Sequence, residues 1–408
     1  MNTSLNKIET IFSKQKIINF LFIIIVFIVT RQFPFSFLSP LMNIAVILMV
    51  CLALSQAKLS KQTILLVIGF LIIPLSFSFL YSFLLTDNKL TLIIRFYVVL
   101  LSVGLAYFVK VDRSTLKVFL KLCLLQVAVL FSIFIFLNLF FDNQSYLPVR
   151  FYFLEQGWGD VYTYGGFFYR VQIKGSALLV VAFILNIEMP LFKRKYLVAA
   201  FFLLGIIIAG NFAFLISLCV YFLYKIITLK KVKSINIYAL RILVFTLLLL
   251  IAAPFIYDYA MSVIDMKKGT SLGTRGDQFY HLMANLAENP FTLFLGQGLG
   301  NTLDVQSTFR DYTGNTYFEV QILYIINQLG IVFFLLFLAY NFLIVLKKLN
   351  NSEIIIVYLI YISYAVTNPY MFDTNHVVVI VILNSWLFII KNKNEFKESS
   401  SHNRSLQA

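Results

Sequence analysis

Long, unbroken runs of apolar residues are the feature that most limits what this chain can fold into. The runs are about 15 to 25 residues long, and short polar segments separate them. They lack the apolar stripe that marks an amphipathic helix of a water-soluble protein. A helical run of about 20 residues matches the roughly 30 Å hydrocarbon core of a bilayer. The sequence therefore predicts an all-α, polytopic integral membrane protein.

Composition and charge placement agree with this interpretation. Hydrophobic residues make up 60% of the chain and charged residues only 12%, whereas a soluble domain carries about 25% charged residues. The net charge of +15 comes from short Lys and Arg clusters between apolar runs, for example 193–195, 230–233 and 347–348. This is the positive-inside pattern of membrane proteins rather than a continuous basic face for nucleic acid. We expect membrane lipids and no nucleic acid as partners.

We expect about twelve transmembrane spans within one domain that covers residues 1–390. Their approximate ranges are 17–33, 36–54, 63–85, 90–109, 118–141, 173–190, 196–209, 212–228, 238–257, 317–346, 352–372 and 376–390. Residues 196–228 could form either one long helix or two short spans. The basic clusters before and after this segment must lie on the same membrane face, which requires two spans. A hairpin that turns at Gly210 and Asn211 meets this requirement. Both termini are then cytoplasmic, and residues 391–408 are expected to form a disordered tail.

Two outward loops are much longer than the others, at about 142–170 and 258–316. Loops of this length in a compact fold usually carry function unless they are disordered. Neither loop has the composition of a disordered segment. We therefore expect the functional site on this face of the membrane.

The second loop contains a predicted short amphipathic helix between Thr274 and Pro290. Its expected apolar side, at helical spacing, consists of Phe279, Leu282, Met283 and Leu286. Its expected polar side consists of Gln278, His281, Asn285 and Glu288. Such a helix is suited to lie on the membrane surface or on top of the helix bundle.

Three glycines follow this helix at alternate positions, Gly296, Gly298 and Gly300. Glycines in such a pattern allow tight turns and bring backbone N–H groups close to a ligand. Their spacing is not that of a dinucleotide-binding loop. Beyond them, Glu319 leads into a long span with Leu-Gly330-Ile near its middle.

This order of features resembles the O-antigen polymerase and O-antigen ligase superfamily of bacterial inner-membrane glycosyltransferases. The shared features are an outward Arg that opens a helix, Asn-Pro about fifteen residues later, a glycine cluster, and a polar turn into a span with Leu-Gly-Ile. About twelve spans and one large periplasmic loop in the C-terminal half, a GT-C-like arrangement, fit as well. Two departures are Gly210-Asn211 in place of Ser-Arg at the mid-chain hairpin, and Glu319 near the place where ligases carry His-Asn. The second departure favours polymerase over ligase.

The resemblance implies a substrate in which an oligosaccharide is attached to undecaprenyl diphosphate. Negative charge grows on the diphosphate as the sugar leaves, and Arg is suited to bind it. Arg275 matches the family motif, and Arg170 lies where the family tends to keep an Arg. Arg150 and Arg310 are further substrate-binding candidates that equally suit lipid headgroups. A chain-length regulator protein is a further implied partner.

A general base would activate the acceptor hydroxyl. His281 and Glu319 are the main candidates, with Asp277 and Asp311 beside them, although a carboxylate here could equally cap a helix or pair with Arg275. The scattered histidines and the outward carboxylates form no metal-binding pattern. We therefore expect neither a metal ion nor a cofactor.

The first outward loop is rich in aromatic residues and glycines, with Trp158 near its centre. Trp158 could stack on a sugar ring, although an interfacial aromatic belt is the commoner use of such residues. Two alternatives to a polymerase remain. One is an O-antigen ligase that joins the glycan to lipid A-core, and the other is a flippase or other transporter of the lipid-linked oligosaccharide.

Overall fold

The computed structural model describes residues 2–142, 144–163, 168–228, 273–306, 311–314, 318–366 and 368–405, with isolated positions between 228 and 273. Side chains are described from residue 14 to residue 392 of these ranges. The predicted span 238–257 falls almost wholly outside the described residues, and Arg310 falls outside them as well.

The described chain is mostly helical, as the sequence predicts. In its first half the helices are α1 (Asn2–Thr30), α2 (Gln32–Phe35), η1 (Ser36–Leu38), α3 (Ser39–Gln56), α4 (Lys61–Val67), η2 (Ile68–Ile72), α5 (Ile73–Leu85), α6 (Leu90–Leu105), η3 (Ala106–Phe108), α7 (Arg113–Phe140) and α8 (Leu147–Glu155). The later helices are η4 (Lys174–Ala177), α9 (Leu178–Glu188), α10 (Lys195–Ala209), α11 (Phe212–Thr228), α13 (Gly273–Leu286), α14 (Pro290–Leu295), α15 (Gln321–Lys348), α16 (Ser352–Ala365) and α17 (Thr374–Ser405).

Six described helical segments are long and apolar enough to cross a membrane. They are Gln32–Gln56, Lys61–Leu85, Leu90–Phe108, Arg113–Phe140, Gln321–Lys348 and Thr374–Asn392, and three shorter apolar helices are Lys195–Ala209, Phe212–Thr228 and Ser352–Ala365. The chain is therefore a helical membrane protein. The finer count of about twelve spans stays a prediction.

The predicted hairpin within 196–228 is confirmed. Helix α10 ends at Ala209, and Gly210 adopts a left-handed conformation with φ of 61°. Helix α11 then begins at Phe212. Glycine ends helices in this way because it has no Cβ to clash in the left-handed region.

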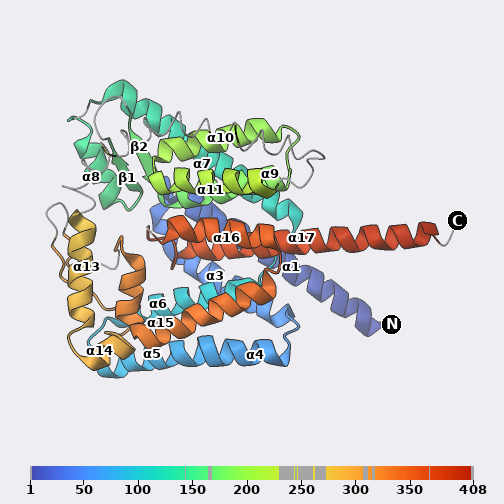
Figure 1. Ribbon diagram of the computed structural model, residues 1–408, viewed down its shortest axis with the longest axis horizontal. Coiled ribbons are helices and arrows are strands. Elements are labelled where there is room, and N and C mark those ends of the chain that lie inside the picture. The colour runs from blue at the N-terminus through green and yellow to red at the C-terminus, as the bar shows by residue number, and fades with distance from the viewer. Residues whose placement is uncertain are drawn as a thin grey trace.

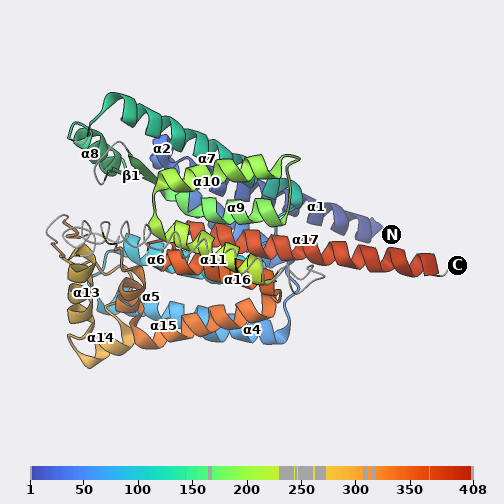
Figure 2. The ribbon, with the colours of Figure 1, turned by 45° about the horizontal axis from the view of Figure 1, so that its top comes forward.

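The two long loops lie at the same end of the bundle. Figure 1 shows α8 and the two strands near one edge of this end and α13 and α14 near the other, while the chain termini project from the opposite end. The turned view of Figure 2 agrees. The strands β1 (Gly159–Tyr162) and β2 (Arg170–Ile173) form an antiparallel hairpin in which Tyr162 pairs with Arg170. This small sheet interrupts an otherwise helical fold.

Helices α9 and α17 form the centre of the bundle. All α9 residues from Leu178 to Asn186 are buried. In the α17 window 78% of the residues are buried inside the protein, against 33–44% in the other five long segments. A helix that is apolar on all sides must be surrounded by other apolar helices or by lipid. Helix α17 continues to Ser405, without Gly or Pro to stop it, into the tail that we expected to be disordered from residue 391.

Helix α15 is broken at Gly330. The sequence predicted one continuous span over 317–346 here, and that prediction is wrong at Gly330. Gly330 has φ of 71° and ψ of 169°, a conformation that is open essentially to glycine alone. The break frees the carbonyls of Asn327 and Gln328, which accept hydrogen bonds from the N–H groups of Gln297 (2.7 Å) and Gly298 (3.2 Å). Since a buried carbonyl without a partner is costly, the glycine loop after α14 stabilises the break.

The predicted faces of α13 are wrong in part. Gln278 is completely buried, whereas Phe279 is 55% exposed. Gln278 points inward because its side-chain oxygen accepts hydrogen bonds from the backbone N–H groups of Glu319 and Val320, just before α15. In a protein surrounded by lipid, an apolar side chain need not face the protein core, so apolar spacing alone misplaced this face.

The contact between Gly296 and Gly330 gives a stability test. A Cβ on Gly330 would lie 2.4 Å from the Gly296 nitrogen, and a Cβ on Gly296 would lie 2.5 Å from the Gly330 nitrogen. Either change to Ala is therefore expected to cost at least about 2 kcal/mol of stability, through backbone overlap and a strained positive φ. Thermal unfolding in detergent measures the loss. Gly276→Ala is the control, because nothing lies within 4 Å of that Cβ and Ala is favoured over Gly in a helix by about 1 kcal/mol.

Candidate functional site

The clearest polar contact at the loop end of the bundle joins two residues that the sequence analysis proposed for catalysis. Arg275 lies in the first turn of α13, and its Nε donates to Oε2 of Glu319 at 2.8 Å. The two side chains are 36% and 23% exposed. Gln278, one turn along α13, fixes the backbone of Glu319. The pair is thus positioned from both sides and remains accessible to a ligand.

The loop between α16 and α17, residues 366–373, connects this pair to the rest of the loop end. Gln172 in β2 donates to the hydroxyl of Tyr370 at 2.8 Å. The side-chain oxygen of Gln321 at the start of α15 accepts from two backbone N–H groups of the loop. Asn211 at the α10–α11 turn donates to Asn368 at 3.0 Å. One loop therefore ties together the β hairpin, the helical hairpin and the entrance to α15.

A second carboxylate, Asp373, lies at the end of this loop beside Lys174. Burial raises its pKa to about 6, although the charge of Lys174 and hydrogen bonds from Asn375 and from the backbone of His376 oppose the rise. Arg95 in α6 interacts electrostatically with Lys174. Tyr370 is within electrostatic range of both Asp373 and Glu319. We call Arg95, Lys174, Arg275, Glu319 and Asp373 the charged cluster.

The charged cluster has an excess of positive charge. Three of its members are cations and two are carboxylates, and one carboxylate is already engaged by Arg275. Lys174 has Asp373 as its acidic neighbour, and the positive charge of Arg95 acts on the same lysine. A surplus of Arg and Lys beside an accessible Arg is suited to an anion with several oxygens, such as a diphosphate.

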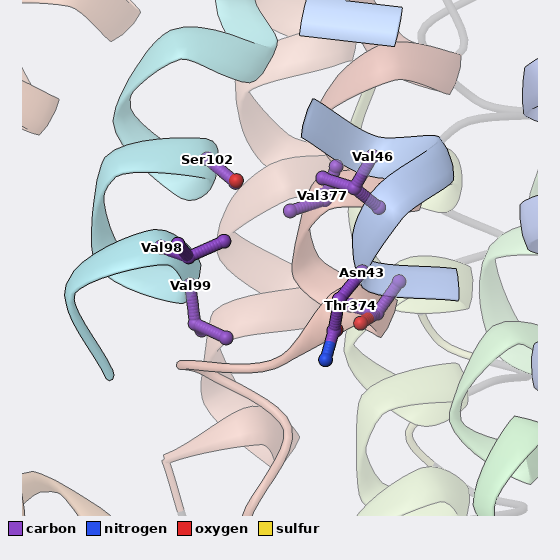
Figure 3. A pocket seen from close by; sticks show the side chains of 7 residues that line it. All are labelled: Asn43, Val46, Val98, Val99, Ser102, Thr374 and Val377. Atoms are coloured by element: carbon purple, nitrogen blue, oxygen red, sulfur yellow. The ribbon is translucent and has the colours of Figure 1, made fainter. Parts of the chain in front are cut away.

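A small cavity lies next to Asp373, between α3, α6 and α17. Figure 3 shows its lining, which consists of Asn43, Ser102, Thr374 and four valines. Its volume of about 10 Å³ is close to the least that holds one water molecule. The cavity is too small for a sugar ring, so a ligand of that size could reach the charged cluster only from its exposed side.

Arg170 is held in place at the tip of the α10–α11 hairpin. It is 9% exposed, and its Nη1 donates to the carbonyl oxygen of Gly210 at 3.1 Å. A Cβ on Gly210 would lie 2.5 Å from Cδ of Arg170, so the absence of a side chain at Gly210 makes room for the arginine. The guanidinium also lies over the ring of Tyr162.

Arg150 and Trp158 are engaged within the first loop. The Arg150 guanidinium binds both carboxylate oxygens of Asp160, at 2.8 and 3.0 Å, and so joins α8 to β1. Trp158 packs edge-on against Phe33 and Phe153, with ring centroids 4.8 and 5.4 Å apart. These contacts favour a structural role for both residues over direct substrate contact.

The glycine loop is also used within the protein. The N–H of Gly298 binds the carbonyl of Gln328, and the N–H of Gly300 binds the Gln328 side chain at 3.0 Å. A Cβ on Gly296, Gly298 or Gly300 would lie within 3.0 Å of atoms of α15, α5 or α6 or of the turn between α5 and α6. These glycines allow close packing within the protein, which favours a structural role for them over contact with a ligand.

His281 lies on α13 but is exposed, with Tyr280 as its neighbouring ring. Within the described residues no hydrogen bond or ion pair joins it to Arg275 or Glu319. Arg310 lies outside the described residues. Of the predicted catalytic residues, the fold therefore brings Arg275 and Glu319 together and leaves His281 apart.

Sequence reasoning missed Lys174 and Asp373. The polar stretch from Thr367 to His376 carries Pro369 and Asp373 between two apolar runs, and this was a signal for a loop rather than a span. Arg31 lies between α1 and α2. It is 5% exposed, and its Nε and Nη2 have no hydrogen-bond partner among the described residues.

Gln278 provides a test of how Glu319 is positioned. Gln278→Leu removes the acceptor for two N–H groups, of Glu319 and Val320. Because each buried donor left without a partner costs about 1–3 kcal/mol, we expect a loss of about 2–4 kcal/mol in thermal unfolding. His281→Leu, on the exposed part of the same helix, should change stability by less than about 0.5 kcal/mol. Equal losses in the two variants would argue against this role.

No protein-family model, curated protein or solved structure matches this chain.

Proposed function

We propose that the chain is a bacterial inner-membrane glycosyltransferase that polymerises oligosaccharide repeat units carried on undecaprenyl diphosphate. The observation that carries the proposal is the accessible Arg275–Glu319 pair, which Tyr370 connects electrostatically to Asp373 and its neighbour Lys174. The charged cluster lies at the end of the bundle opposite the termini, and with cytoplasmic termini this end faces the periplasm. The resemblance of residues 274–331 to O-antigen polymerases supports the same activity.

In this mechanism the cations bind the diphosphate of the donor lipid. Arg275 exchanges its contact with Glu319 for diphosphate oxygens, and Lys174 and Arg95 add positive charge beside it. The bond between the anomeric carbon and the diphosphate oxygen breaks, and the electron pair remains on the diphosphate. Cations positioned in advance stabilise this developing charge in the transition state. Glu319 keeps Arg275 oriented before the donor arrives.

The acceptor is a hydroxyl group on a second lipid-linked repeat unit. Its oxygen forms the new bond to the anomeric carbon, with inversion in a single displacement, and its proton passes to Asp373. A carboxylate with a pKa of about 6 is better suited to this step near neutral pH than one of ordinary pKa, since an effective base has a pKa near the working pH. Asp311 is less suited, because hydrogen bonds from Thr313 lower its pKa.

Arg170 fits the proposal as a positioning residue. The family tends to carry an arginine at the hairpin tip, and here Gly210 leaves space that the Arg170 side chain fills. Arg170 thus places a guanidinium at the tip of this hairpin, where Gly210-Asn211 carries none. A chain-length regulator is the expected protein partner.

Arg275→Ala is expected to abolish polymerisation and leave lipopolysaccharide that carries single repeat units. The physical reason is the loss of the cation that binds the leaving diphosphate, which is worth about 2.7–4 kcal/mol for comparable electrostatic groups. The measurement is the ladder of chain lengths on a gel. Arg113→Ala, at the start of α7, is the matched control and should give a normal ladder.

A charge reversal separates catalysis from folding. Arg275→Glu combined with Glu319→Arg should restore an ion pair and normal stability without restoring the ladder. A normal ladder in Arg275→Ala or in the reversed pair would refute the assignment. Bare core with accumulated lipid-linked chains would indicate a ligase instead, and sugar transfer by the purified protein would exclude a flippase.

The pH dependence tests the base. Transfer by the purified protein should rise as the pH increases through about 6, because Asp373 must be deprotonated to accept a proton. Asp373→Asn should lose this rise. Lys174→Gln should move it to higher pH, since the charge of Lys174 lowers the pKa of Asp373. If the rise persists in Asp373→Asn but disappears in Glu319→Gln, the base is Glu319.

A further inference from the structure

A larger cavity lies at the opposite end of the bundle, where the termini emerge. Its volume is about 530 Å³, within the roughly 300–1,000 Å³ range of small-ligand sites. Helices α1, α3, η3, α15 and α17 contribute to its walls, together with the segments that follow α3 and η3. None of the groups in the charged cluster lines it, so it is a separate site.

Lysines dominate the charge of this cavity. Its lining contains Lys58, Lys110, Lys347, Lys348 and Lys391, and it contains no aspartate or glutamate. Lys348 is close enough to Lys110, Lys347 and Lys391 for mutual repulsion. Within the described part of the chain, none of these lysines forms a salt bridge. The lysines that line the cavity therefore have no acidic partner among the described residues.

Two of the lysines face aromatic rings instead of carboxylates. The ammonium of Lys110 lies 4.5 Å from the ring centroid of Phe388, and that of Lys348 lies 4.9 Å from the ring centroid of Phe108. Such contacts hold a cation in place without neutralising it. Partial burial, followed by the charge of Lys391, lowers the pKa of Lys110, and an anion in the cavity would offset the repulsion between these two charges.

The cavity also presents a neutral hydrogen-bond donor. Gln56 at the end of α3 lines it, and the side-chain Nε2 of Gln56 is buried without a partner among the described residues. Asn384, in contrast, is fixed by hydrogen bonds to the carbonyls of Tyr107 and Val109. The unpartnered N–H group of Gln56 and the nearby lysine ammonium groups are suited to bind a negatively charged ligand with several hydrogen-bond acceptors.

We propose that this cavity binds a phosphate group, supplied either by the headgroup of an anionic phospholipid or by a free phosphorylated ligand. Phosphate meets the requirements of the site, since its oxygens accept several hydrogen bonds at once and carry the charge that the lysines lack. Basic pockets between transmembrane helices on the cytoplasmic side are suited to anionic lipid headgroups. This inference is independent of the glycosyltransferase proposal.

The test measures binding to the full-length protein purified in a neutral detergent and stripped of lipid. The probes are phosphatidylglycerol, phosphatidylcholine as the zwitterionic comparison, and inorganic pyrophosphate. At least one phosphate probe should bind and raise the unfolding temperature, and phosphatidylcholine should not. Lys110→Gln combined with Lys348→Gln should weaken binding at least tenfold, and the double Lys→Arg variant should retain it.

Lys61→Gln combined with Lys121→Gln is the matched control. These two exposed lysines lie outside the cavity, so the control removes the same charge and should bind within twofold of the unmodified protein. Binding of phosphatidylglycerol alone assigns the site to a lipid headgroup, and binding of pyrophosphate alone assigns it to a free ligand. Equal weakening in the two Gln variants, or no binding of either phosphate probe, would overturn the proposal.

Discussion

The break of α15 at Gly330 is the structural constraint on which the loop end of this protein depends. A helix that continued straight would carry Glu319 away along its axis. The left-handed glycine instead turns the segment before it alongside α13, where Gln278 and Asn285 bind it. The glycine loop after α14 satisfies the carbonyls that the break frees. Hydrogen bonds that repair a helix break thus bring Arg275 and Glu319 together.

The two ends of the bundle treat charge differently. At the loop end, cations and carboxylates alternate, and Arg275 and Lys174 each have an acidic neighbour that a ligand can displace or share. At the end with the termini, five lysines surround a cavity that has no acidic lining. Mixed charge suits a reaction in which a proton and a leaving group both move. Charge of one sign suits binding alone.

The sequence alone determined the class of the protein and much of its helical outline. The hairpin at Gly210 followed from the placement of basic residues, because the positive-inside rule acts on the chain before tertiary contacts form. The contact between Arg275 and Glu319 was also foreseen as one alternative, since pairing with Arg275 is an ordinary use of a nearby carboxylate. Lys174 and Asp373 were not, because they are about 200 residues apart and only the return of α17 to the bundle centre places them together.

Tertiary structure alone decided how the polar groups are used. The glycines that resembled a ligand loop pack against α15, α5 and α6, and Arg150 is neutralised by Asp160. It also decided which face of α13 turns inward. The backbone N–H groups before α15 need a hydrogen-bond acceptor, and Gln278 supplies it from the buried face, against the apolar spacing. Lipid supplies an apolar environment outside the protein, so hydrophobicity along the sequence locates the helices in the membrane. Hydrogen bonds and charges that must be satisfied inside the protein orient them.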